Sequence, residues 1–90
     1  MVHITAIHMS TGGTGHQHIA SVKWTNPATS ASGQSTTAEM VDFIDNQNGV
    51  AKVKNGSTEV LVGTVNATPK YLRTYADGQW TDNLLSLPRY

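Results

Sequence analysis

The spacing of apolar residues in the first third of the chain predicts strands. Residues 2–9 alternate loosely between apolar and polar side chains and are rich in Ile and Thr, as is typical of a strand. A Gly-rich stretch interrupts this pattern, and apolar residues resume over residues 18–24. Two strands joined by a short Gly-rich loop indicate an antiparallel hairpin. The polar segment 26–33 has no periodicity and is expected to form a loop.

A single helix is predicted after this loop. Thr36 can cap it with its hydroxyl, and Glu39 three residues later completes a capping box. Gly49 suits the left-handed position that ends a helix. A helix of about eleven residues is not stable alone in water, so it is expected to pack on the sheet. Its apolar face would consist of Ala38, Met40, Val41, Phe43 and Ile44.

The remainder of the chain returns to strand patterns. Residues 50–54 and 59–66 flank Asn55-Gly56, a hairpin signal, and the second of these runs is apolar enough to be central. Pro69 begins a further strand that reaches residue 74, and Ala76-Asp77-Gly78 is predicted to turn the chain. The apolar tail, residues 84–88, is expected to dock on the core. The predicted fold class is α+β, with element order ββαβββ: an antiparallel sheet of about five strands and one short helix packed on one face.

Composition narrows the class of protein. The 90 residues fit one domain, 1–90. Six basic residues balance six acidic ones, and only 13% of residues are charged, which argues against a general nucleic-acid binder. The absence of Cys excludes disulfides, thiolate metal sites and a Cys nucleophile. The low charge and the 38% hydrophobic content indicate a homo-oligomer. No signal peptide or membrane-length apolar run is evident, so a cytoplasmic location is expected.

Histidines gather near the start of the chain, at His3, His8, His16 and His18. On a strand, residues two apart point to the same face, so His16 and His18 would present their ring nitrogens to one metal ion. The alternative is a set of surface histidines, because no Asp or Glu precedes Glu39 to orient a ligand. A histidine metal-binding module therefore remains an alternative, and no cofactor is expected.

The loop that contains Gly12, Gly13 and Gly15 is a second candidate. Its backbone N–H groups are expected to be exposed, and such groups can cradle a phosphate. The loop has no Walker lysine and does not lead into a helix, so it matches no nucleotide-binding fingerprint. A flexible hairpin connection is the alternative interpretation.

The third candidate lies on the strand that begins after Pro69. Alternation places Tyr71, Arg73 and Tyr75 on one face, where they can stack a planar ring and pair a phosphate. Trp80 and Asn83 would reach the same region. The alternative is a structural role, in which Arg73 lies across the tyrosine rings.

Catalysis has little support in the sequence. No Gly-x-Ser-x-Gly elbow is present. Asp42 and Asp45 lie three residues apart on the predicted helix, but the outer face of a capped helix is where solvated charges normally lie. His16 or His18 would be the available general base. We therefore expect the protein not to be an enzyme.

The last third of the chain resembles a known pattern. Tyr71-Leu72-Arg73-Thr74, Asp77-Gly78 and Asp82-Asn83-Leu84-Leu85-Ser86-Leu87-Pro88 are similar to the closing motif of a small family of uncharacterised bacterial and phage proteins. The resemblance covers residues 36–88. It carries no activity, but it implies a structural role for the motif, in which Arg73 ties the tail to the sheet. It also implies a phage protein that binds and blocks a host-defence component.

These observations together predict a non-catalytic binding protein that sequesters a small nucleotide-like or phosphorylated ligand in host-defence evasion. A protein–protein inhibitor or adaptor of a host protein is the alternative, and membrane binding is not expected. The predicted ligand-binding residues are Gly12, Gly13, Gly15, His16, His18, Tyr71, Arg73, Trp80 and Asn83.

Overall fold

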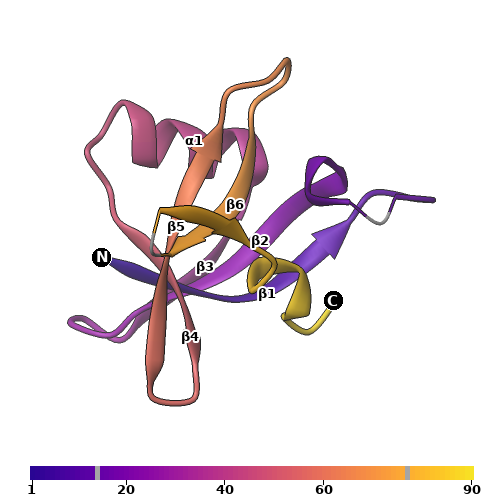
Figure 1. Ribbon diagram of the computed structural model, residues 1–90. Coiled ribbons are helices and arrows are strands. Elements are labelled where there is room, and N and C mark those ends of the chain that lie inside the picture. Colours follow the sequence, from indigo (N-terminus) through magenta and orange to yellow (C-terminus); the bar gives the residue numbers. More distant parts are fainter. Residues whose placement is uncertain (14, 77) are drawn as a thin grey trace.

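The computed structural model describes residues 1–13, 15–76 and 78–90. Seven strands, one α-helix and two short 3₁₀ helices follow one another along this part of the chain (Figure 1). In chain order they are β1 (Val2–Met9), η1 (His16–His18), β2 (Ile19–Asn26), β3 (Ala31–Thr36), α1 (Thr37–Asp45), β4 (Ala51–Asn55), β5 (Thr58–Val65), β6 (Tyr71–Ala76), β7 (Gln79–Thr81) and η2 (Leu84–Ser86).

The seven strands form one mixed sheet in the order β3-β2-β1-β4-β5-β6-β7. The prediction of an antiparallel sheet of about five strands is therefore wrong, although the fold remains broadly α+β. All neighbouring strands are antiparallel except β1 and β4, which pair in parallel through Val2–Ala51 and His3–Lys52. The chain crosses through α1 before it enters β4, and such a crossover is what a parallel pair requires.

Strand β3 begins inside the segment 26–33 that was predicted to be a loop, and it continues to the helix cap at Thr36. It pairs with β2 over its whole length, from Asn26–Ala31 to Ser21–Thr36. A short turn joins the two strands, in which the Asn26 side chain accepts the N–H of Ala28 and Ser30 has a φ of 62°. Small polar residues carry little strand propensity, so the pairing with β2 decides the structure of this segment.

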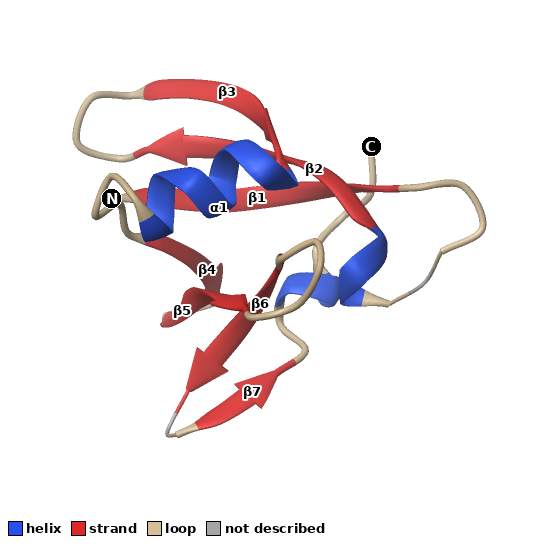
Figure 2. Cartoon of the chain, turned by 90° about the horizontal axis from the view of Figure 1, so that it is seen from above, coloured by secondary structure: helices blue, strands red, loops and turns tan. Residues whose placement is uncertain are grey.

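The sheet bends into two wings, with α1 on its concave face. We call β1–β3 the first wing and β4–β7 the second wing. Figure 2 shows β4–β7 turning away from β1–β3, and α1 packs against β2 and β3 of one wing and β5 and β6 of the other. Apolar side chains from both wings fill the space beneath the helix. The largest fully buried ones are Ile4, Ile7, Val22, Val53, Val62, Leu72 and Leu84.

Irregular pairing explains the loose alternation of the first strand. The β1–β2 register shifts between Ile4 and Ala6, which is the effect of a β-bulge. Ile4 and Ile7, three residues apart, are both buried as a result.

The helix begins as the sequence predicts and ends differently. Glu39 N–H donates to the Thr36 hydroxyl, and Thr36 N–H donates to the Glu39 carboxylate, which is a complete capping box. The helix has nine residues rather than about eleven. Asn48, with a φ of 55°, takes the left-handed position that was predicted for Gly49. Gly49 instead lies directly against the Phe43 ring, where there is no room for a Cβ.

The second half of the chain follows the predicted strands to within two residues. Gly56 has a φ of 64° and opens the two-residue loop between β4 and β5. A glycine at the first central position is typical of a type II′ hairpin turn. The predicted turn at Ala76-Asp77-Gly78 includes Asp77, which lies outside the described residues; Gly78 has a φ of 80°.

The tail packs on the core, as the sequence predicts. Leu84 in η2 is fully buried, and the chain then passes beside β1, where Ile7 forms a parallel bridge to Arg89. This bridge lies beyond the two residue pairs that join β1 to β4. The tail therefore closes the gap that opens where the two wings diverge.

Candidate functional site

The structure does not place His16 and His18 on a strand. Both belong to the 3₁₀ helix η1, where residues two apart do not share a face. His16 is only 8% exposed, whereas His18 is exposed to solvent. Among the described residues, the Nε2 atom of His16 is a buried polar atom with no hydrogen-bond partner.

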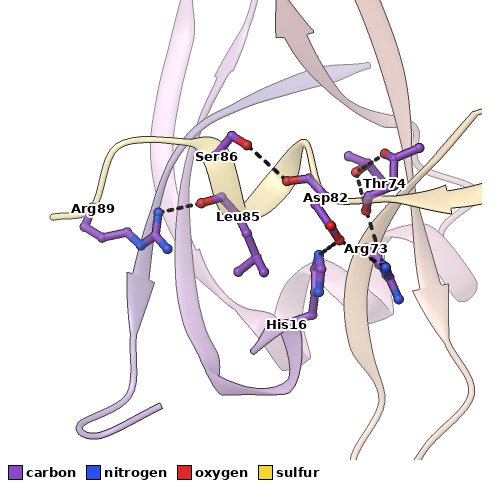
Figure 3. A network of polar contacts seen from close by, with 8 residues as sticks. His16, Arg73, Thr74, Asp82, Leu85, Ser86 and Arg89 are labelled. Atoms are coloured by element: carbon purple, nitrogen blue, oxygen red, sulfur yellow. Dashed lines mark hydrogen bonds and ion pairs between the residues drawn. The ribbon is translucent and has the colours of Figure 1, made fainter. Parts of the chain in front are cut away.

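Two of the predicted site residues, His16 and Arg73, meet at Asp82 (Figure 3). The Arg73 guanidinium donates to Asp82 Oδ1 over 3.0 Å and to the carbonyl of Thr81 over 3.2 Å. The His16 Nε2 atom lies 3.8 Å from the same Asp82 oxygen. Because η1 contacts β6, these residues tie the two wings together. Arg73 is thus engaged by the fold, as the structural interpretation of the motif implies.

The electrostatic environment keeps His16 neutral. Burial lowers the pKa of the imidazole below its usual 6.5, and the positive charge of Arg73 lowers it further. The Asp82 carboxylate raises the pKa and offsets part of this effect. Loss of solvation is the largest cause, so the site resists protonation near neutral pH.

The Gly-rich loop does not join the other predicted residues in one pocket. Gly12 has a φ of 79° and faces open space, whereas Gly13 lies directly against the His18 side chain. A Cβ on Gly15 would lie 2.6 Å from the Gln17 amide oxygen. Thr14, in the middle of this loop, lies outside the described residues.

Of the predicted aromatic residues, Trp80 lies on the outer face of the strands β4–β7, next to Tyr75. Tyr75 pairs across strands with Leu61 on one side and Trp80 on the other. The rings of Tyr75 and Trp80 meet edge to face, with centroids 5.1 Å apart. All three side chains are at least 40% exposed. We call Leu61, Tyr75 and Trp80 the aromatic patch.

Tyr71 and Asn83 are half-buried and lie apart from that patch. Tyr71 pairs with Val65 at the start of β6. Asn83 lines a separate cleft of about 260 Å³, together with Val53, Lys54, Asp82, Ser86 and Leu87. The nine predicted residues are thus distributed over several surfaces.

The remaining polar candidates have structural partners. His3 is hydrogen-bonded to Glu59 over 2.7 Å, and the His8 ring contacts Tyr90. Within the described part of the chain, no group of three or more His, Cys, Asp or Glu side chains is placed to hold a metal ion.

The two helix carboxylates do not form a pair. Hydrogen bonds from Asn46 and Gln47 lower the pKa of Asp42. Hydrogen bonds from Lys70 and Thr64 lower the pKa of Asp45. Each carboxylate therefore has its own set of partners.

A further cleft, lined in part by aromatic and aliphatic side chains, lies between α1 and the strands β1–β3. It encloses about 420 Å³, which is within the range of small-molecule sites. We call it the Trp24 cleft. Its lining consists of Met1, Val2, Trp24, Asn26, Ala31, Ser35, Glu39, Met40, Phe43 and Gln47.

Local structure holds the aromatic walls of this cleft in place. The Trp24 indole N–H donates to the Ser35 hydroxyl over 3.0 Å. The ring also lies over Gly33, its cross-strand partner, where a Cβ would be 2.8 Å from Trp24 Cζ2. Gly49 likewise lies against the Phe43 ring, at a distance that a Cβ atom would not allow. Two glycines therefore set the positions of the two aromatic rings.

The sequence patterns assign the residues of this cleft to three separate elements and do not predict that they meet. Trp24 is the last residue of a predicted strand, Gly33 lies in a segment predicted as a loop, and Phe43 belongs to the predicted apolar face of the helix. Only the pairing of β3 with β2 brings Gly33 and Ser35 to Trp24. The residues of β3 are small and polar without an apolar alternation, so they leave no periodic pattern to detect.

No helix within residues 1–13, 15–76 and 78–90 is long and apolar enough to cross a membrane.

A family model described as protein of unknown function, DUF3892, matches residues 3–88. The chain belongs to the DUF3892 family. This confirms that the chain belongs to a family of unknown function, and the match covers residues 3–88 rather than 36–88. The DUF3892 match includes the whole lining of the Trp24 cleft except Met1 and Val2. No curated protein and no solved structure matches the chain.

Proposed function

We propose that this protein is a non-catalytic binding protein that holds a small planar ligand in the Trp24 cleft. The observation that carries the proposal is the cleft itself, an apolar hollow of about 420 Å³ walled by Trp24 and Phe43. Apolar pockets with a few converging polar groups are the usual form of a small-molecule site. Aromatic walls favour a flat ring, because offset stacking and edge contacts both need one.

The polar groups at the rim indicate the kind of ring. Asn26 uses its amide oxygen to accept the N–H of Ala28, so its NH₂ group can donate to a ligand. Glu39 uses one carboxylate oxygen in the capping box, so the other can accept. A ring with a nitrogen acceptor and an exocyclic amino group, such as a nucleobase, has complementary groups.

A phosphate is not part of the ligand that this lining favours. Among the described residues around the Trp24 cleft, Glu39 is the one charged side chain, and it is acidic. Arg73, the predicted phosphate partner, is bonded to Asp82 and Thr81. The proposal therefore keeps the nucleotide-like ring of the sequence-based hypothesis and omits the phosphate.

Calorimetric titration with adenine and with AMP tests this function. Ala31 is exposed and lines the cleft, so Ala31→Leu should fill it without disturbing the core. We expect adenine to bind the native chain, AMP to bind no more tightly, and Ala31→Leu to weaken adenine binding at least about tenfold, or about 1.4 kcal/mol. Ala28→Leu, at an exposed turn position outside the lining, is the matched control. Absence of adenine binding, or equal loss in both variants, would contradict the proposal.

A second candidate function, protein binding, is favoured by the aromatic patch. Trp and Tyr are enriched among residues that dominate protein interfaces. Lys52 lies next to Leu61 in the same cross-strand row, and Lys54 lies on the same strand. No ion pair to a carboxylate is found for either lysine within the described residues. The patch therefore suits a partner protein with an acidic rim around an apolar centre.

A peptide of alternating Glu and Leu is a suitable probe for the patch. We expect it to shift the indole N–H resonance of Trp80 but not that of Trp24, and the shift to disappear in Lys52→Glu/Lys54→Glu. A Trp80 resonance that does not respond to the peptide, or that responds equally in the charge-reversed variant, would rule out this second function.

A further inference from the structure

Strand β3 forms one end of the sheet, so no strand of the described residues lies beside one side of its backbone. It is six residues long and pairs with β2 without a register shift. The opposite edge, β7, has three residues. Natural proteins protect edge strands with charges, proline, bulges or short length. β7 is protected by its length, whereas all six residues of β3 are described and none is charged or proline.

Self-pairing suits this edge better than it suits other surfaces of the molecule. In an antiparallel pair across a two-fold axis, a strand meets its own sequence, and like charges directly opposite each other are destabilising. β3 has no charge to repel its copy. The zero net charge of the chain also gives little repulsion between two molecules. By contrast, the aromatic patch has a charged neighbour, Lys52, which is the cross-strand partner of Leu61.

The side chains of β3 also argue against a strand of another protein as the preferred partner of this sheet edge. On the concave face, Ala31, Gly33 and Ser35 are small, and two of them line the Trp24 cleft. Strand addition by a foreign peptide obtains its specificity from pockets for alternate side chains. A second β3 would place only small side chains beside β3 on the concave face. It would therefore border the Trp24 cleft and leave the cleft open to a ligand.

We propose that β3 pairs antiparallel with β3 of a second copy of this chain, so that the two sheets become continuous. The backbone groups of each edge then satisfy those of the other. Each Trp24 cleft would have the second copy's strand beside it, so the partner would contribute to the site. The pairing does not depend on a ligand, so it can fail or succeed independently of the proposed binding function.

Sedimentation velocity over a range of protein concentrations tests this pairing. The native chain is expected to sediment as a dimer of the 9.7 kDa chain. Gln34→Lys places a charge in the middle of β3, where its side chain is exposed, and should weaken dimerisation at least about tenfold. Gln79→Lys places the same charge on the exposed surface of β7 and should leave the dimer intact.

A monomer at every concentration would overturn the proposal and leave the edge available to a foreign strand. A dimer that tolerates Gln34→Lys, or that Gln79→Lys disrupts equally, would also overturn it and place the interface elsewhere. Hydrogen exchange of the native chain provides a readout that needs no variant. Amide protection within β3 should rise with protein concentration, and protection that does not change would count against the pairing.

Discussion

The imidazole of His16 is almost entirely buried, and its charged neighbours are Arg73 and Asp82. The pKa of His16 is lower in the folded protein than the 6.5 expected for the unfolded chain. As the pH falls, the unfolded chain therefore binds a proton first. The contribution of the neutral His16 to the free energy of unfolding should be fully present above pH 6.5. It should be lost as the pH falls from 6.5 through the folded-state pKa.

Urea unfolding between about pH 8 and pH 5 measures this dependence. His16→Gln should flatten the curve in that window, and His18→Gln, in the exposed part of the same 3₁₀ helix, should not. Carboxylates with lowered pKa values, such as Asp42, lose their contribution only at more acidic pH. An equal slope in the native and His16→Gln proteins would contradict the role given to burial.

Single residues also show what the sequence could and could not reveal about the site. His16 and Arg73 were predicted as ligand-binding residues on separate grounds, the histidine cluster and the alternation of a strand, and neither pattern predicts that both meet at Asp82. Trp24 was recognised as a strand residue only. Its position depends on Gly33 and Ser35, which reach it through the pairing of β3 with β2. Chemistry that arises from such pairs is not present in local patterns.

At the scale of elements, α1 was the best-predicted part of the fold because its start signal is local. Both bonds of the capping box between Thr36 and Glu39 are present. Thr36→Ala removes the hydroxyl acceptor and should cost about 1 kcal/mol in the free energy of unfolding. Thr36→Ser keeps the acceptor and is the matched control. A thermal unfolding series in which both variants lose the same stability would show that the cap contributes little.

β3 and the three-residue β7 are the strands that the sequence failed to predict, and β3 is the more informative case. Its residues are small, polar and without periodicity, and their strand conformation comes from pairing with β2 and from the cover that Trp24 gives to Gly33. The parallel contact of β1 with β4 is a similar case, because it joins residues about fifty positions apart through only two residue pairs. Tertiary contacts, not propensity, decide both features.

At the scale of the whole molecule, the tail joins the two wings. Leu84 is fully buried, and the Ile7–Arg89 bridge brings the end of the chain to the first strand. Leu84→Ala should therefore reduce the free energy of unfolding by 2–5 kcal/mol, which is the usual cost of a leucine-sized core cavity. Leu85→Ala, at a partly buried position beside it, should cost less. Chemical denaturation of the two variants measures the difference, and equal losses would argue against a tail that completes the core.

The Trp24 cleft is the site proposed to hold a small planar ligand. The chain has two tryptophans, one in the cleft and one on the aromatic patch on the other side of the sheet. A two-dimensional NMR titration of the native protein with adenine reads both indole N–H groups at once. We predict that the Trp24 resonance and the Met40 methyl resonance shift with the same saturation curve, while the Trp80 resonance stays in place. A titration in which Trp24 does not respond, or in which Trp80 responds alone, would contradict the claim.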